Sequence, residues 1–321
     1  GCVSSSCTNI PDMDSDFQTL AGLPLMDQRI GVFSPSGAYD VARLDRGMAW
    51  LRSLGAQVLP APNLGQTHRY LAGTDAQRRE DLTWALGSAE LDVAWMARGG
   101  FGLARICEPL PPVAPGRRVV GFSDGTALHA ALWNQGISGL HAPVLHSLCD
   151  LGDLASQARV VRCLLGKAEG IWKGESWIPG EIAGPLVGGN LCMLASIAGT
   201  GLQPDFSGCI LLLEEIAEPP YKLDRMLCQL LACGMLDGVV GLALGEFVGT
   251  STPEDWSLRE LLIELLEDLD VPILAGLPVG HGHVNQAFYW GQAAVLSQDR
   301  LELGTLSNPS ARGSHGRHPL V

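Results

Sequence analysis

Three kinds of residue in this sequence suit covalent catalysis: a serine on a sharp turn, a pair of glutamates and a histidine-rich loop. Ser123 lies in Gly121-Phe-Ser-Asp-Gly125, between the strand-like residues 118–120 and the helix-like residues 126–133. A G-x-S-x-G segment needs this strand-to-helix setting, because the turn exposes the serine hydroxyl. Ser123 is therefore the candidate nucleophile.

A nucleophilic serine also needs a general base, which we expect among the eight histidines. Glycines flank His281 in Pro278-Val-Gly-His-Gly-His-Val-Asn285, a loop setting in which catalytic groups concentrate. The spacing does not separate His281 from His283, and no Cys or acidic residue nearby completes a metal site. His141 follows a strand and is a second candidate for a cleft. His129 lies in an apolar helix and is expected to be a hydrogen-bonded core residue.

Two carboxylates stand at the end of a strongly apolar strand, in Leu211-Leu-Leu-Glu-Glu-Ile216. A buried carboxylate is costly unless it has a partner, and an imidazolium would be one. The alternative for Glu215 and Glu218 is a helix-capping or surface role. The resulting order along the chain is serine, acid, histidine.

A glycine-rich segment, Arg98-Gly-Gly-Phe-Gly102, directly follows another strand. Glycines let backbone N–H groups approach a ligand closely, which would suit an oxyanion hole or a phosphate. The segment lacks the spacing of the dinucleotide fingerprint, and the sequence has no P-loop lysine. A tight turn without a ligand is the alternative.

Composition excludes several classes of partner. The 321 residues carry 34 acidic and 21 basic side chains, for a net charge of −13, so nucleic acid and anionic membranes are poor partners. No apolar run reaches membrane-spanning length. The nine cysteines form no C-x-x-C pair and are expected to be buried or free thiols, which favours a reducing cytoplasm. The first 27 residues do not form an intact signal peptide.

Alternating strands and helices from residue 29 to about residue 148 predict a parallel sheet covered by helices. The fold class is therefore α/β, with a flavodoxin-like or Rossmann-like N-terminal domain over 29–150. A connection is expected over 151–182, and a β-rich α+β C-terminal domain over 183–303. Residues 1–28 and 304–321 are expected to be a flexible extension and a flexible tail.

Taken together, these motifs resemble the LD-carboxypeptidase family of serine peptidases. The resemblance covers roughly residues 29 to 300, with order and spacing kept throughout. It is carried by residues 70–82 (YLAGTDAQRREDL), 97–102 (ARGGFG), 121–132 (GFSDGTALHAAL), 184–191 (GPLVGGNL), 211–227 (LLLEEIAEPPYKLDRML) and 278–282 (PVGHG). Departures are small: Gly125 stands where the family often has a bulkier residue, and Lys222 stands where an arginine is common.

The resemblance implies a catalytic triad of Ser123, Glu214 and His281, and so selects the first glutamate and the first histidine of each pair. It implies no metal and no cofactor. The substrate would be the murein tetrapeptide of cell-wall recycling, cleaved in the cytoplasm to release a terminal D-alanine. The family is usually homodimeric, with the active site between its two domains.

Further residues are expected around this triad. The backbone N–H groups of Gly100 and Asp124 would form the oxyanion hole. A terminal carboxylate needs a cationic or N–H-rich site, for which Arg98, Gly99 and Asn190 are the candidates.

Three other functions compete. Microcin C immunity peptidases, which belong to the same family, cleave aminoacyl or peptidyl nucleotide conjugates. An α/β-hydrolase esterase shares the serine turn and the chain order, but predicts continued strand-helix alternation beyond residue 149. A non-catalytic peptide-binding protein on the same scaffold is the third, because fold does not fix function.

Overall fold

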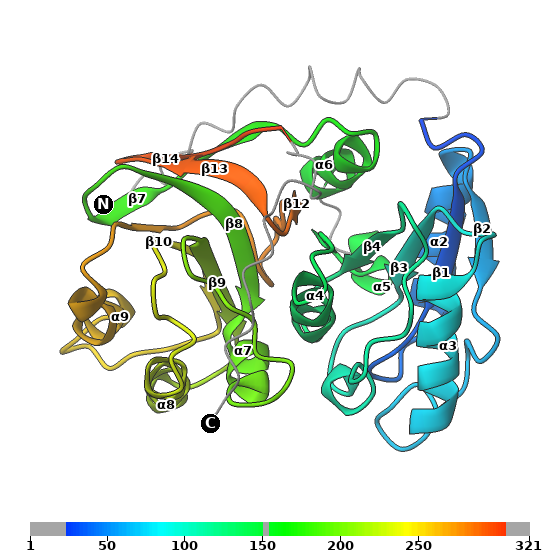
Figure 1. The fold of residues 1–321 in the computed structure, drawn as a ribbon, viewed down its shortest axis with the longest axis horizontal. Helices are drawn as coiled ribbons and strands as arrows, with labels where there is room; N and C mark the ends of the chain where they lie inside the picture. Colours follow the sequence, from blue (N-terminus) through cyan, green and yellow to red (C-terminus); the bar gives the residue numbers. More distant parts are fainter. Residues whose placement is uncertain (1–23, 150–153, 306–321) are drawn as a thin grey trace, which may run out of the picture.

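Two β-sheets, each with its own helices, make up the molecule (Figure 1). The computed structural model describes residues 24–149 and 154–305. The flexibility expected at the two ends of the chain concerns residues that mostly lie outside these ranges.

The first sheet has six strands in the order β12-β5-β4-β3-β1-β2. Five of them are parallel and come from the N-terminal half, and β12 joins the edge antiparallel to β5. The strands are β1 (Arg29–Phe33), β2 (Gln57–Pro60), β3 (Val93–Met96), β4 (Arg118–Gly121), β5 (Leu140–His141) and β12 (Phe288–Tyr289).

Continuous apolar runs explain why this sheet lies between helices. All four residues of β3 and the last four of β1 are buried, as expected for parallel strands covered on both faces. Thr74 and Gln77 form a capping box that starts α3. The helices are α2 (Val41–Ser53), α3 (Asp75–Gly87), α4 (Gly125–Trp133), α5 (Leu145–Leu148) and α6 (Leu154–Leu164), with a short 3₁₀ helix η1 (Leu103–Arg105).

The strand order β2-β1-β3-β4-β5 is that of flavodoxin-like sheets, so the predicted fold class is confirmed for this half. The order reverses between β1 and β3, and ligands of open α/β sheets bind at such a switch point, outside the carboxyl ends of the strands. The loops that leave β1, β3 and β4 therefore share one edge of the sheet. The glycine-rich segment and Ser123 both lie in these loops.

The second sheet is mixed and has eight strands in the order β6-β14-β13-β8-β9-β10-β11-β7. Strands β8 to β11 are parallel, and the others pair antiparallel. The strands are β6 (Gly170–Lys173), β7 (Glu175–Ile178), β8 (Ile182–Asn190), β9 (Ile210–Ile216), β10 (Gly241–Val248), β11 (Ile273–Ala275), β13 (Gln292–Leu296) and β14 (Arg300–Leu303).

Three helices and a 3₁₀ turn accompany the second sheet: α7 (Leu191–Ile197), α8 (Pro220–Ala232), α9 (Leu258–Leu266) and η2 (Glu267–Leu269). The antiparallel strands confirm the expected β-rich C-terminal half, although strand-helix alternation continues beyond residue 149 in the parallel unit β8-α7-β9-α8-β10-α9-β11. Among the residues that the structure describes, no helix combines the length and apolarity needed to cross a membrane.

The two edge strands of the second sheet are one continuous stretch of chain. Only Gly174 separates β6 from β7, although they lie at opposite ends of the strand order. A Cβ on Gly174 would lie 2.7 Å from the Ala275 carbonyl oxygen, so the close crossing requires glycine. The stretch expected as a connection, 151–182, thus also supplies α6, whose residues are helix-like in the sequence, and both edge strands, which are too short to show a pattern.

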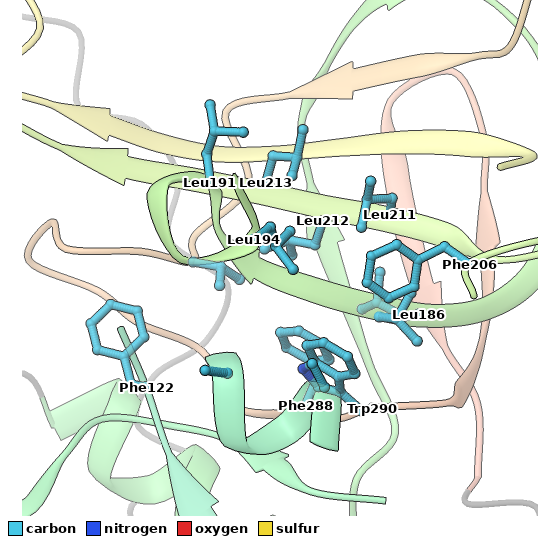
Figure 2. Packing of buried hydrophobic residues seen from close by; sticks show 14 of the residues in the cluster. Phe122, Leu186, Leu191, Leu194, Phe206, Leu211, Leu212, Leu213, Phe288 and Trp290 are labelled. Atoms are coloured by element: carbon cyan, nitrogen blue, oxygen red, sulfur yellow. The ribbon is translucent and has the colours of Figure 1, made fainter. Parts of the chain in front are cut away.

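One apolar core joins the two sheets. Figure 2 shows Phe288 and Trp290 opposite Leu186 and Leu212 of the second sheet, with Phe122 to the left of them, and all five belong to a single buried cluster. Because β12 comes from the C-terminal half of the chain but pairs with β5, the chain crosses between the sheets again before β13.

Candidate active site

Ser123 occupies a strained turn between β4 and α4. Its φ angle is 61°, a left-handed conformation that a non-glycine residue adopts only where the surroundings enforce it. The side chain is partly exposed and lies against Gly99, where a Cβ would come within 2.9 Å of the Ser123 Cβ. The glycine-rich segment is therefore packed directly against the candidate nucleophile.

Glu214 and His281 are hydrogen-bonded to each other across 67 residues of sequence. The Glu214 Oε2 atom lies 2.7 Å from His281 Nδ1. Glu214 follows the apolar residues Leu211–Leu213 of β9 and is fully buried, whereas 17% of the His281 side chain is exposed. Gly280 has a φ of 137°, and a Cβ there would lie 3.1 Å from Glu214 Oε2, so glycine lets the loop approach the carboxylate.

This pair lies beside the serine turn. The His281 ring packs on the ring of Phe122, the residue before Ser123, with 4.4 Å between their centroids. Within the described residues, Ser123 and His281 share no hydrogen bond, and such bonds frequently tighten only when substrate binds. The structure thus brings together the three elements that carry the predicted nucleophile, acid and base.

The second glutamate has a different task. Both carboxylate oxygens of Glu215 are occupied: Oε2 accepts from Cys192 N at 2.7 Å, and Oε1 accepts from Asn190 Nδ2 and Ile216 N, each at 2.9 Å. Burial raises the pKa of Glu215, and these bonds oppose the rise. Glu215 therefore caps the start of α7, whereas the helix-capping or surface role expected from the sequence concerned the residues before Pro219-Pro220 at the start of α8.

Asn285 holds the loop that carries His281. Its Oδ1 accepts from Gly280 N at 3.2 Å and lies 3.3 Å from His141 Nε2, and its own N–H donates to Ser156 Oγ at 2.8 Å. His141 is fully buried and stacks on Phe288, and burial lowers its pKa to about 3. His141 is therefore a neutral core residue and does not line an open cleft.

Two other histidines are also placed. His129 Nε2 lies 3.0 Å from the carbonyl oxygen of Gly121 and the residue is fully buried, as expected for a hydrogen-bonded core histidine. His283 is exposed, and the hydrogen bond to Glu214 is made by His281.

The two expected oxyanion donors make no hydrogen bond within the described part of the protein. Among the described residues, the backbone N–H groups of Gly100 and Asp124 donate to no protein acceptor. Gly100 is exposed with a φ of 107°, whereas Asp124 is fully buried as a residue. Neither N–H group is therefore engaged by the protein within the described part of the chain.

The three predicted carboxylate-binding residues are placed differently. Arg98 is exposed and donates from Nη1 to the carbonyl oxygen of Ala38 at the rim of the switch-point loops. Gly99 is buried against Ser123. Asn190 is buried and engaged by the protein, since its Oδ1 caps α7 by accepting from Met193 N at 3.1 Å.

Sequence reasoning missed one carboxylate next to the histidine loop. Glu246 lies on β10, and a Cβ on Gly282 would come within 1.3 Å of its Oε2. Burial raises the pKa of Glu246, and the nearby charge of Glu214 adds to this effect. The signal was present, because Glu246 follows the apolar run Gly241-Leu-Ala-Leu-Gly245 much as Glu214 follows Leu211-Leu-Leu213.

Comparison with known proteins decides the family. The LD-carboxypeptidase N-terminal domain matches residues 30–142, and the LD-carboxypeptidase C-terminal domain matches residues 183–296. The chain belongs to the LD-carboxypeptidase family. As a member of this family it is a hydrolase of the serine carboxypeptidase class, and the resemblance seen in the motifs is confirmed.

LD-carboxypeptidase relatives match over almost the whole chain. A putative carboxypeptidase of Synechocystis sp. is 40% identical over 295 residues, which is 90% of this chain and 97% of that protein. The murein tetrapeptide carboxypeptidase of Pseudomonas aeruginosa is 32% identical over 313 residues, or 92% and 99% of the two chains.

Solved LD-carboxypeptidase-like structures share the fold. Muramoyltetrapeptide carboxypeptidase from Oxalobacter formigenes superposes with a TM-score of 0.78 at 26% identity, covering 88% of this chain and 100% of that one. The wild-type microcin C7 self-immunity protein superposes with a TM-score of 0.79 at 20% identity, covering 88% and 97%, and shows likeness of fold alone.

Proposed function

We propose that this protein is a serine carboxypeptidase that cleaves an L,D-peptide bond and releases the terminal D-alanine of a murein tetrapeptide. The observation that carries the proposal is the Glu214–His281 pair at 2.7 Å, packed through Phe122 against the strained turn of Ser123. The relatives named for murein peptides support the choice of substrate class.

The hydrogen bond to Glu214 supports the roles that we propose within the triad. If His281 Nδ1–H donates to the buried carboxylate, Nε2 is left without a proton and can accept one from the serine hydroxyl. The carboxylate holds the ring in this tautomer and stabilises the imidazolium that forms. It does not itself need to take up the proton.

The reaction then proceeds in two halves. Ser123 Oγ bonds to the carbonyl carbon of the L,D-amide while His281 takes the hydroxyl proton, and the N–H groups of Gly100 and Asp124 stabilise the oxyanion. The C–N bond breaks as His281 returns the proton to the leaving amine of D-alanine. Water then attacks the acyl ester with His281 again as the base, which releases the shortened peptide and restores the serine.

The remaining features of the proposal concern recognition and setting. Arg98 stays our candidate for the terminal carboxylate, because it is the exposed cation of the glycine-rich segment. Gly99 and Asn190 stay candidates for shaping that site. We also propose a homodimer acting in cell-wall recycling in the cytoplasm, and light scattering of the purified protein tests the dimer.

Mass spectrometry of a murein tetrapeptide incubated with the purified protein tests the function. We expect loss of one D-alanine, and no loss with Ser123→Ala or with an all-L control peptide. Tetrapeptides with diaminopimelate or lysine at the third position identify the preferred stem. Cleavage of an aminoacyl nucleotide conjugate without cleavage of the tetrapeptide would instead assign a microcin-type immunity peptidase, and turnover of simple esters alone would assign an esterase.

A further inference from the structure

Two loops meet at the switch point of the first sheet, and the candidate oxyanion hole depends on one of them. The β1 loop comprises residues 34–37, and the β3 loop comprises residues 98–103 and contains Gly100. Gly37 N donates to the Gly99 carbonyl oxygen at 3.0 Å, and a Cβ on Gly37 would lie only 3.0 Å from that oxygen. The two loops are thus in direct backbone contact.

The Asp124 carboxylate accepts hydrogen bonds from both of these loops. Its Oδ2 accepts from Ser36 Oγ of the β1 loop at 2.6 Å and from Leu103 N of the β3 loop at 2.9 Å. The side chain is fully buried, one residue after the candidate nucleophile. Burial raises the pKa of Asp124, and the two hydrogen bonds oppose the rise.

Arg78 of α3 bridges the two loops a second time. Its Nη1 donates to the carbonyl oxygen of Pro35 in the β1 loop and to that of Gly102 in the β3 loop, the latter at 3.0 Å. Its Nη2 pairs with Asp75 at 2.5 Å, and the Arg78 side chain is fully buried. A guanidinium is built for this task, because its donors are fixed in one plane.

Neither side chain has a part in the proposed chemistry, although Asp124 contributes its backbone N–H. A buried arginine and a buried aspartate need a reason, since burying a charge is costly unless it is paired and hydrogen-bonded. The need to hold the β3 loop in one conformation explains why both charged groups are buried here. The three glycines of this loop, of which Gly100 and Gly102 have φ angles of 107° and 138°, give it many conformations to lose on ordering.

We propose that Arg78 and the carboxylate of Asp124 are positioning residues that clamp the β3 loop to the β1 loop and so fix the Gly100 N–H as an oxyanion donor. The oxyanion part of this proposal rests on the proposed function. The clamp itself does not, because it concerns the order of the loop. An oxyanion donor acts only if it is held in place before the charge develops.

Arg78→Met removes the clamp from α3, and Arg79→Met is its matched control. Arg79 is the next residue of the same helix and also donates to backbone carbonyls, those of Ile106 and Pro109, but it touches neither loop. We expect Arg78→Met to lower kcat by at least about tenfold with KM within about threefold, since transition-state stabilisation is lost. Labelling of Ser123 by a fluorophosphonate should slow in parallel, and Arg79→Met should stay within about twofold of wild type.

Amide hydrogen exchange, measured by mass spectrometry, tests without any substrate whether the clamp orders the β3 loop. Exchange in residues 98–103 should accelerate in Arg78→Met and stay unchanged in Arg79→Met. If Arg78→Met does not fold, Gly102→Ala disrupts the same contact by changing the β3 loop instead of α3. The added Cβ would lie 2.5 Å from Arg78 Nη1. Arg78→Lys, which keeps the charge but not the planar fork, should fall between wild type and Arg78→Met.

The outcomes separate the two levels of the proposal. Unchanged exchange in residues 98–103 overturns the clamp, and faster exchange with unchanged kcat and labelling overturns its role in the oxyanion hole. Wild-type protein that neither cleaves peptide nor labels at Ser123 contradicts the proposed function, and the exchange experiment still decides whether the clamp exists.

Discussion

At the scale of single residues, Glu214 and Glu215 show how two identical neighbours acquire different tasks. They point to opposite sides of β9, because successive side chains of a strand alternate. One side faces the loop after β11 and brings Glu214 to His281, and the other faces the start of α7 and brings Glu215 to Cys192 N. The sequence could propose the pair, but the choice between them required the partners, which lie far away along the chain.

Substitution by glutamine separates these two tasks. Glu214→Gln should lower kcat by about 10² or more, because the amide cannot hold the imidazolium as a carboxylate does. Glu215→Gln should keep most of the activity and lower stability by about 1 kcal/mol, as for a weakened helix cap. Steady-state kinetics and urea unfolding of both variants check this. The reverse pattern of kinetic losses would show that Glu215 is the catalytic acid.

His141 predicts how stability responds to acid. Its pKa is lowered to about 3 in the folded protein, whereas an unfolded histidine titrates near 6.5. Below about pH 6.5, His141 is therefore protonated in the unfolded chain but stays neutral in the folded protein. The free energy of unfolding consequently falls as the pH falls toward 3.

His141→Gln removes this contribution. The substitution should destabilise the protein at pH 7, because the stacking on Phe288 is lost. At pH 4.5 the deficit should be smaller by roughly 2–3 kcal/mol, since only the wild type then loses stability through this proton. Urea unfolding of both proteins at the two pH values measures the difference. An equal deficit at both values would mean that His141 is protonated in the folded state.

At the scale of elements, local patterns were enough for the helices and most strands. In the sequence, Thr74 can cap a helix, Leu223 to Leu231 have the apolar spacing of a helix and 292–296 is a strand-like run, and α3, α8 and β13 contain these residues. The longer strand β8 was not predicted, and neither were the short strands β6, β7, β11, β12 and β14. The positions of the short strands depend on pairing with distant strands, which leaves no periodicity in so few residues.

The histidine loop and β10 must also fit each other, and this can be tested. Gly282→Ala should lower kcat, because its Cβ would overlap Glu246 Oε2 and displace the loop beside His281. The overlap is with the end of a side chain, so Glu246→Ala in the same protein should restore much of the loss. A double variant no better than Gly282→Ala would mean that the glycine is needed for its backbone. The Glu246→Ala single variant completes the cycle.

At the scale of the whole molecule, the proposed chemistry requires two sheets to keep a fixed relation. Ser123 leaves the first sheet, whereas Glu214 and His281 belong to the second, so a small relative movement would separate base from nucleophile. The shared core resists such movement. Asn190 N donates to Thr126 Oγ1 at 3.1 Å, and Trp133 Nε1 donates to the Asp205 carbonyl oxygen at 3.1 Å, so polar contacts reinforce the apolar ones.

Trp290 is the central side chain of the core that the two sheets share. It is fully buried. The centroid of its ring lies 5.8 Å from that of His129, 6.3 Å from that of Trp133 and 5.8 Å from that of Phe206. Two of these neighbours belong to α4, the helix that starts just after Ser123. Removing the indole should therefore loosen both the fold and the alignment of the proposed triad.

Trp290→Ala should destabilise the protein by about 3–5 kcal/mol, as for a large ring removed from a core. Fluorescence and far-UV circular dichroism should still report one coincident unfolding transition, because both sheets share the core, and labelling of Ser123 should slow. Trp50→Ala is the control, since Trp50 is half-buried on α2 and packs on Trp95 within the first sheet's own layer. Its loss should lower stability less and leave labelling near wild type. Two separate transitions in Trp290→Ala would mean instead that each sheet folds on its own and that the shared core serves alignment alone.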